Sequence, residues 1–375
     1  MSYRWPFFVA LTASFLFFFS FQMLLAPFPL FVQSIGGTPA DLGLVMGVFA
    51  LTAVLSRPLA GWLADSKGRR IGLIIGGLIF TVSFVLYAVV KSLKVLIPLR
   101  LFHGTGIAFF TTAYIALISD LAPPDRRGEA LGLAAMASPL SLLVSPLVGA
   151  YLAKGGHFSR LFLASAGVSA LSLALSSLLP ETLLDAPAPK KQRGFAYLFH
   201  RPYIWLLISI TITVAVTYGA VISFLPVFVE ERGVGNAGLF FSAFAFTLLV
   251  IQVAAGRLSD RVGRRAVAVP AIGLLALSMA LTARLNSQAS LLLAAVIYGL
   301  GYGATRTSID ATIVDKVVKG ARGTAMGLNY AGFDFGIGMG SFLLGLVAEM
   351  WNYQVMYASI AGLCLLVGLI FLVLS

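Results

Sequence analysis

Ionisable side chains stand inside long apolar segments of this sequence. Arg306 and Asp310 are four residues apart, so a helix would carry them on one face. Asp334 lies among glycines in the middle of the next apolar segment, and Arg100 lies in an earlier one. A charge inside a membrane is costly unless it is paired or hydrated, so such residues are usually functional. Because a carboxyl group in this setting can bind and release a proton, Asp334 and Asp310 are candidates for proton coupling.

Each of these residues also has a structural interpretation. Arg306 and Asp310 could simply neutralise each other, and Asp334 could be the partner of Arg306 or of Arg100. Arg100 could serve a buried ion pair instead of a substrate. The sequence leaves both interpretations open for all four residues.

Two uncharged polar residues, Gln22 and His103, lie in apolar segments and are further candidates for substrate or proton contact. Neither a G-x-S-x-G nucleophile motif nor an H-E-x-x-H zinc motif occurs, and the single cysteine, Cys364, offers no thiolate metal site. We therefore expect no enzyme activity, no catalytic residue, no metal and no cofactor.

The composition indicates which elements carry these side chains. Hydrophobic residues make up 59% of the 375 residues and charged residues only 11%, with a mean hydropathy of +0.97. A membrane helix needs about 20 mainly apolar residues. The sequence predicts twelve of them, near 7–33, 41–64, 71–91, 94–118, 129–154, 159–180, 203–230, 236–258, 266–284, 289–314, 321–348 and 353–374. Pro27, Pro29 and Pro226 predict bends in the first and seventh helices.

A short charged loop occurs twice, 195 positions apart, which indicates a duplicated protein. The first copy follows the second helix, and its glycines should let the helices approach and the chain reverse, while Asp65 could cap a helix end. The first copy comprises Gly61, Asp65, Gly68, Arg69 and Arg70, with Asp120 and Arg127 further on. The second copy comprises Gly256, Asp260, Gly263, Arg264 and Arg265, with Asp315 and Arg322 further on.

A stripe of small residues is repeated at the same offset. Ala137, Ser141, Ser145 and Gly149 are spaced by four, and Gly332, Gly336 and Gly340 match the first three. Such a stripe allows another helix to pack closely.

The loop pattern G-x-L-A-D-x-x-G-R-R resembles the signature loop of the major facilitator superfamily. The segment from Arg100 to Gly106 is similar to that family's fourth-helix pattern R-x-x-Q-G-x-G, with His103 in place of the glutamine. The resemblance implies an all-α polytopic membrane protein of two pseudo-symmetric six-helix bundles that rock about a central site. It also implies a cytoplasmic gate in which Arg69, Asp120 and Arg127 form one network.

The polar segment 181–202 predicts three parts: an amino-terminal six-helix bundle (1–180), a cytoplasmic linker (181–202) and a carboxy-terminal six-helix bundle (203–375). Most basic residues fall in loops on one side of the predicted helices. The positive-inside rule then predicts that both termini lie in the cytoplasm, and we expect the protein in the cell membrane. This distribution explains the net charge of +12 without nucleic acid.

A secondary transporter is the class that these patterns favour. No G-x-x-x-x-G-K-[ST] phosphate loop is present for an ATP-driven pump. The resemblance is greatest to the superfamily's exporters, which exchange a drug or metabolite for protons. We therefore expect a monomer that exports a small molecule by alternating access, with protons and the lipid bilayer as its other partners. A proton-coupled importer, a uniporter and a non-transporting sensor remain alternatives.

Overall fold

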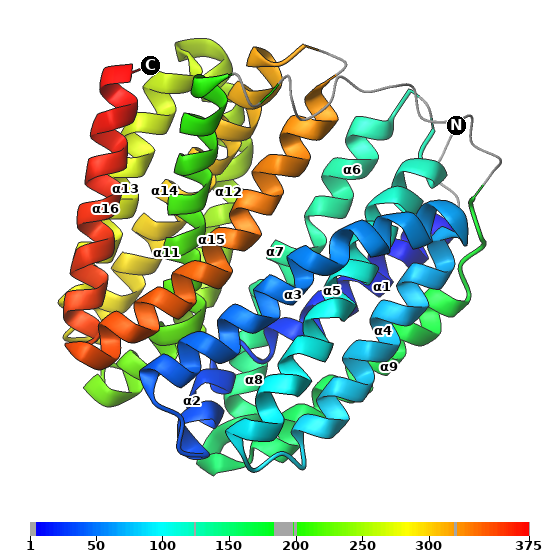
Figure 1. Cartoon of the computed structure of the whole chain (residues 1–375), viewed down its shortest axis with the longest axis horizontal. Coiled ribbons are helices and arrows are strands. Elements are labelled where there is room, and N and C mark those ends of the chain that lie inside the picture. The colour runs from blue at the N-terminus through cyan, green and yellow to red at the C-terminus, as the bar shows by residue number, and fades with distance from the viewer. Residues whose placement is uncertain (1–4, 124, 184–197, 199–200, 319–320, 375) are drawn as a thin grey trace. The chain divides into compact units, whose positions relative to one another are not determined.

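The computed structural model describes residues 5–123, 125–183, 198, 201–318 and 321–374, and the regular elements among them are all helices (Figure 1). Twelve of the described segments are long and apolar enough to cross a membrane. The predicted all-α polytopic architecture is therefore confirmed. The chain divides into two compact units, one of Met1–Gly37 with Val48–Ala186 and the other of Thr38–Gly47 with Pro187–Ser375.

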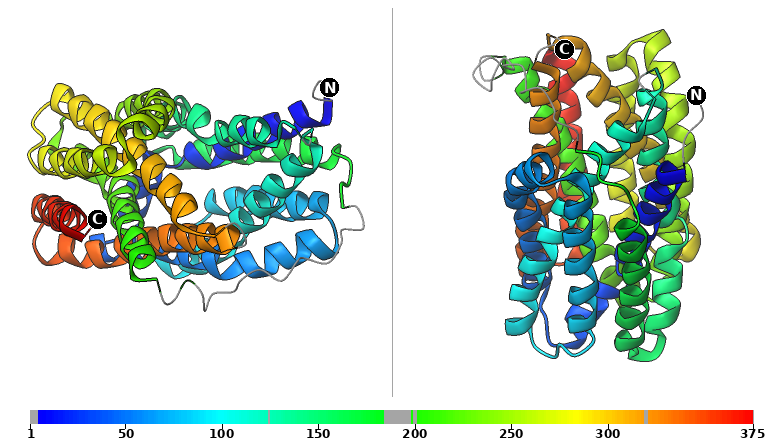
Figure 2. Two further views of the ribbon diagram at one scale, coloured as in Figure 1. Left: turned by 90° about the horizontal axis from the view of Figure 1, so that it is seen from above. Right: turned by 90° about the vertical axis from the view of Figure 1, so that its right-hand side faces the viewer.

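Helix α4 lies between two neighbours in the first unit, α5 and α9 (Figures 1 and 2). Buried aromatic rings form the core of this unit, with Phe17 stacked on Phe110 at 3.7 Å between ring centroids. Aromatic pairs of this kind contribute about 0.5–1.5 kcal/mol beyond the area they bury. The helices of this part of the chain are α1 (Trp5–Gln22), α2 (Pro27–Ser34), α3 (Pro39–Ser66), α4 (Arg69–Tyr87), α5 (Leu93–Leu121), α6 (Arg127–Ala135), α7 (Ala137–Leu142), α8 (Ser145–Ala153), η1 (Lys154–Gly156) and α9 (Phe158–Ser177).

Two of the predicted membrane helices are interrupted. The first divides into α1 and α2 just before Pro27, and the fifth divides into α6, α7 and α8. The interruptions meet, because a Cβ on Gly149 of α8 would overlap the backbone of Met23, which follows α1. Freed backbone groups are tolerated at membrane depth where neighbouring helices cover them. The predicted bend at Pro27 thus became a break, whereas α11 runs through Pro226 without interruption.

Helices α11 and α15 pack closely in the second unit, as do α13 with α14 and with α16 (Figures 1 and 2). Cβ atoms on Gly336 and Gly340 would press on Ile212 and Val216 of α11, so this stripe of glycines lets the two helices approach. The helices of this unit are α11 (Pro202–Arg232), α12 (Ala237–Val262), α13 (Arg264–Ala283), α14 (Gln288–Lys316), α15 (Arg322–Met350) and α16 (Tyr353–Leu374).

The start of α3 belongs to the second unit. Glu349 of α15 accepts hydrogen bonds from Thr38 Oγ1 and from the backbone N–H of Ala40, both at 2.8 Å. Most of the predicted linker 181–202 lies outside the described residues, so the predicted boundaries at 180 and 203 remain a prediction.

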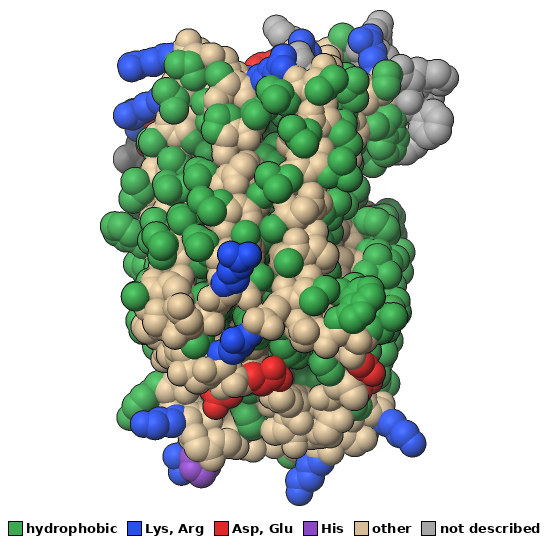
Figure 3. Space-filling model, turned by 90° about the vertical axis from the view of Figure 1, so that its left-hand side faces the viewer, with side chains coloured by type: hydrophobic (Ala, Val, Ile, Leu, Met, Phe, Trp, Pro, Cys, Tyr) green, Lys and Arg blue, Asp and Glu red, His purple; other side chains and the backbone are tan. Residues whose placement is uncertain are grey.

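One face of the molecule shows how the fold suits a bilayer. Hydrophobic side chains cover its middle, and most of the charged side chains gather towards its two ends (Figure 3). Many large apolar side chains are exposed, among them Leu55, Val89 and Val373 at 68%, 70% and 80%. Exposure on this scale fits a protein whose outer surface contacts lipid.

Candidate functional site

Arg69 joins three helix ends in the first unit. Its Nη1 donates to Asp65 Oδ1 at 2.5 Å and to the Ala64 carbonyl at 2.6 Å, both at the end of α3. Its Nε donates to Asp120 Oδ2 at 3.2 Å, at the end of α5. Because Arg69 begins α4, this one guanidinium holds the ends of α3, α4 and α5 together. A planar guanidinium with several fixed donors is suited to bridging acceptors in this way.

Glu181 completes the start of α4. Its carboxylate accepts from the backbone N–H groups of Arg69 at 2.8 Å and Arg70 at 3.1 Å, and also from those of Thr182 and Leu183, both at 2.9 Å. A carboxylate at a helix N-terminus satisfies donors that lack a partner inside the helix. Partial burial acts to raise the pKa of Glu181, but these four backbone donors outweigh it and lower the pKa.

Gly68 makes room for that carboxylate. Its φ of +118° reverses the chain between α3 and α4, and a Cβ at this position would collide with the Glu181 carboxylate. The expected helix cap was Asp65, but that residue binds the Arg69 side chain, and Glu181 supplies the cap. The expected close approach at Gly61 is also wrong, since a Cβ there would touch nothing within 4 Å.

Arg264 repeats the arrangement in the second unit. Its Nε donates to Asp315 Oδ2 at 3.1 Å, its Nη1 donates to Ser259 Oγ at 2.8 Å, and it also pairs with Asp260. No carboxylate caps α13 within the described residues, and a Cβ on Gly263 would meet open space.

The remaining gate residues do not all join these clusters. Arg127 is exposed and makes no ion pair in the part of the chain that the structure describes. The implied network of Arg69, Asp120 and Arg127 is therefore wrong in its third member. Arg322 donates to the backbone carbonyl of Val317 at 3.4 Å rather than to an acid.

The other second-copy residues also have specific surroundings. Arg265 donates to the backbone carbonyl of Leu372 in α16. A Cβ on Gly256 would lie 3.7 Å from the Thr307 side chain, which is an ordinary contact. These two positions therefore fit helix packing.

Arg100 lies in the first half of α5 and is enclosed by aromatic rings. Only 2% of the residue is exposed, and its guanidinium lies 4.6 Å from the Phe28 ring centroid and 4.3 Å from that of Phe49. A cation over an aromatic face gains about 2 kcal/mol or more when both are desolvated. The positive charge of Arg100 also interacts electrostatically with the side chains of Tyr87 and His103.

His103 is fully buried one turn further along α5. Its Nδ1 lies 3.0 Å from the Tyr87 hydroxyl oxygen, whereas its Nε2 has no hydrogen-bond partner among the described residues. Rings of Phe80 and Phe84 flank the imidazole.

Gln22 connects the two interrupted helices. Its Nε2 donates to Ser138 Oγ at 2.9 Å, and its Oε1 accepts from Ser141 Oγ of α7. With 4% of the residue exposed, both ends of the amide are used in packing.

Arg306 and Asp310 form an ion pair at membrane depth in the second unit. Arg306 Nη2 lies 3.9 Å from Asp310 Oδ2, and the guanidinium lies 4.1 Å from the Phe333 ring centroid. Asp334 of α15 acts electrostatically on Arg306 as well. The structure thus brings together three of the six candidates predicted from the sequence, while Gln22, Arg100 and His103 lie in the other unit.

Asn329 and Thr211 belong to this cluster and were not predicted. Asn329 Nδ2 donates to Asp310 Oδ1 at 2.7 Å, and Thr211 Oγ1 donates to Asn329 Oδ1 at 2.7 Å. The signal for Asn329 was present, because an amide in a membrane helix needs a partner. Glu181 was also missed, since nothing in the sequence relates it to α4.

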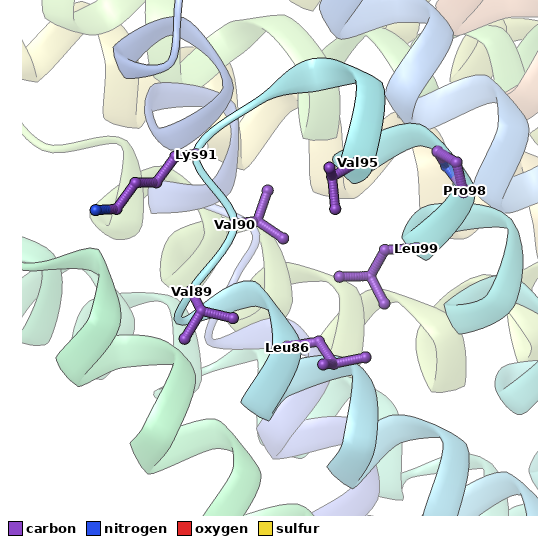
Figure 4. A pocket seen from close by; sticks show the side chains of 7 residues that line it. All are labelled: Leu86, Val89, Val90, Lys91, Val95, Pro98 and Leu99. Carbon is purple, nitrogen blue, oxygen red and sulfur yellow. The ribbon is translucent and has the colours of Figure 1, made fainter.

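The structure also has an apolar cavity of 340 Å³ between the end of α4 and the start of α5 (Figure 4). Its lining contains none of the predicted site residues. The lining side chains are Leu86, Val89, Val90, Lys91, Val95, Pro98 and Leu99.

The described part of the chain has twelve segments of membrane-spanning length in two units. Each unit has a charged loop centred on an arginine, Arg69 or Arg264. These features are typical of a polytopic transporter. The sequence profile of the Major Facilitator Superfamily matches residues 10–240 and 233–375. The chain belongs to this superfamily, and the resemblance seen in its loops is confirmed.

Two relatives that match more than nine tenths of the chain are named as exporters. The multi-drug resistance efflux pump PmrA of Streptococcus pneumoniae is 27% identical, with 93% of this chain and 90% of the relative covered. The staphylopine export protein of Staphylococcus aureus is 24% identical, with 98% and 95% covered. Among solved structures, the nucleoside transporter NupG has a TM-score of 0.84 at 16% identity, with 98% of this chain and 99% of that one covered.

Proposed function

We propose that this protein exports a small organic molecule, a drug or a metabolite, in exchange for protons by alternating access. The observation that carries the proposal is the Arg306–Asp310 pair at membrane depth. Ionisable groups within membrane helices typically mark ion and substrate pathways. The names of PmrA and of the staphylopine export protein support the outward direction.

Asp310 is the proposed proton carrier. Its carboxylate lies 3.9 Å from the Arg306 guanidinium, a distance longer than that of a strong charge-assisted hydrogen bond. Protonation would neutralise Asp310 and release Arg306 to bind a substrate group. Buried Arg100 and Arg306 favour neutral or anionic substrates over cationic ones. Asp334 acts on the same arginine and is the second candidate for the proton.

The two arginine-centred loops are the proposed gate elements. Each holds the ends of three helices, and the positive-inside rule predicts that both loops lie on the same side of the membrane. We place that side in the cytoplasm of a cell-membrane protein with both termini inside, and we propose that the monomer is the functional unit. Transport would require the contacts of Asp65 and Asp260 to break and re-form in each cycle, because a ligand shifts a conformational equilibrium only through differential binding.

Proteoliposomes with imposed proton gradients test the proposal. A thermal-shift screen of lipophilic drugs, organic acids, nucleosides and metal chelates at about pH 5.5 and 7.5 first selects a ligand, since a ligand that binds the folded state raises its stability. Uphill movement of that ligand against an inward proton flow is the expected result. Movement with the protons would make the protein an importer, pH-independent downhill movement a uniporter, and binding without movement a sensor.

Variants of Asp310 and Asp334 test which of the two carboxyl groups carries the proton. Asp310→Asn should abolish transport driven by a pH gradient while it retains exchange of substrate across the membrane at constant pH. Asp334→Asn is the matched variant and should retain coupling. The opposite result would move the proton to Asp334, and retained coupling in both would contradict a carboxylate carrier in this cluster.

A further inference from the structure

We propose that Asn329 is a positioning residue that assigns the exchangeable proton to one oxygen of Asp310. Asn329 directs an N–H donor at Oδ1, so the proton binds Oδ2, the oxygen nearest to Arg306. This inference rests on the proposed role of Asp310 as the proton carrier.

The hydrogen bonds of Asn329 fix its amide from both ends. Nδ2 donates to Asp310 Oδ1 at 2.7 Å, and Oδ1 accepts from Thr211 Oγ1 at 2.7 Å. Asn329 is completely buried and Thr211 is 1% exposed, so water cannot replace either partner. Three helices, α11, α14 and α15, therefore meet in one short chain of hydrogen bonds.

Amide geometry determines which oxygen can take the proton. An amide has a donor end and an acceptor end, and a carboxylate oxygen that accepts from an N–H has no need of a proton of its own. A proton on Oδ1 that points towards Asn329 would face the N–H, and the amide would have to turn to accept it. That turn would present Asn329 Nδ2 to Thr211 and leave the threonine hydroxyl hydrogen without its acceptor. Protonation at Oδ2 requires none of these changes.

The charged and titratable groups around Asp310 come from α14 and α15. Arg306 and Tyr302 share its helix, and α15 contributes Tyr330 and, through Arg306, Asp334. Helix α11 contributes the neutral Thr211. In the described part of the chain, α12 and α13 add no charged group to this cluster.

Protonation of Asp310 at Oδ2 directly changes the ion pair with Arg306. Oδ2 is the oxygen that lies 3.9 Å from Arg306 Nη2, so an O–H bond formed there replaces the ion pair. Arg306 keeps its own proton and its charge throughout. Its Nη1 is buried without a hydrogen-bond partner among the described residues, so protonation of Oδ2 leaves both Nη1 and Nη2 without an acceptor from Asp310 and able to bind a substrate group.

Infrared difference spectroscopy of the full-length protein in lipid vesicles tests this inference without a known substrate. The C=O stretch of a protonated carboxyl group is followed against pH, and its loss in Asp310→Asn identifies the band. Thr211→Val removes the hydroxyl at nearly constant volume, and Thr211→Ser restores it as the matched control. Asn329→Ala removes the donor to Oδ1 directly, and thermal unfolding of each variant reports whether it folds.

We expect Asn329→Ala to move the midpoint of the Asp310 band to higher pH by about one unit, because a hydrogen bond that stabilises the charged form is lost. Thr211→Val should shift the midpoint in the same direction by less and change the band frequency, while Thr211→Ser should match the wild type. Wild-type titration in both Asn329→Ala and Thr211→Val would overturn the inference and leave Asp310 as the carrier. A carboxyl spectrum unchanged in Asp310→Asn would instead overturn the proposed role of Asp310, and this inference with it.

Discussion

The two copies of the charged loop have the same ion pairs but different support. In both, an arginine at the start of one helix binds an aspartate four residues earlier and a second aspartate at the end of the following helix. Among the residues that the structure describes, a carboxylate caps the helix N-terminus in the first copy alone, and that residue is Glu181. We call each arginine with its two aspartates a clamp. Both copies of the loop have this clamp, but in the first copy Glu181, which follows α9, adds hydrogen bonds to the start of α4.

The ion-paired side chains of the first copy are also more buried than those of the second. The Arg69 side chain is 13% exposed and that of Arg264 is 27% exposed, while Asp120 and Asp315 are 32% and 55% exposed. Because exposed ion pairs are screened by water and salt, the first copy should contribute more to stability than the second. The comparison teaches that a repeated motif predicts its own contacts but not the strength of those contacts.

The largest expected effect is that of alanine at the turn glycines. Gly68 and Gly263 have φ values of +118° and +96°, so either substitution should cost on the order of 1–3 kcal/mol in strain. Gly68→Ala should lose about 1 kcal/mol more, because its methyl group also displaces the Glu181 cap. Thermal unfolding in detergent, followed by tryptophan fluorescence, compares the two. Equal losses would show that the cap adds no stability.

Replacing Arg69 or Arg264 should give the next largest difference in stability between the two copies. Arg69→Ala should lower the free energy of unfolding by about 2 kcal/mol and Arg264→Ala by about 1 kcal/mol, since Arg69 is the more buried of the two. Measurements at low and high salt give a second test. The Arg264 variant should approach the wild type as salt is raised, and a salt-independent loss would contradict its exposed character.

The two copies of the loop should differ less in their effect on the transport rate than in their effect on stability. Asp65→Asn and Asp260→Asn should each reduce the transport rate roughly tenfold, as expected for one charge-assisted hydrogen bond, with little change in substrate affinity. Initial rates in proteoliposomes and binding isotherms separate the two quantities. A large loss of binding in either variant would mean that its aspartate supports the substrate site rather than the gate.

The smallest effect concerns the cap alone. Glu181→Gln should lower stability by about 1 kcal/mol or less at neutral pH. Because the folded state lowers the pKa of Glu181, its stabilising effect is fully present above the ordinary carboxyl pKa of 4.5 and is lost as the pH falls through the lowered value. The difference in unfolding temperature between wild type and Glu181→Gln should therefore vanish in acid. A difference that persists there would show that the carboxylate charge is not its source.

The sequence predicted most of the fold because membrane helices are specified locally. Apolar length alone identified all twelve spans, and the repeated loop identified the duplication. The breaks after Gln22 and within α6–α8 could not be placed this way, because they depend on contacts such as that of Gly149 with Met23. Pro27 and Pro226 illustrate the limit, since one proline follows a break and the other lies in a continuous helix.

By itself the sequence determined which residues are charged, which segments are apolar and which patterns are repeated, and these were enough for the family and the twelve-helix architecture. The tertiary structure alone decided the partners: Glu181 on α4, Asn329 between Asp310 and Thr211, and Arg127 outside the clamp. The physical reason is that helix formation in a membrane depends on local composition, whereas a hydrogen bond depends on the distance between atoms of different helices.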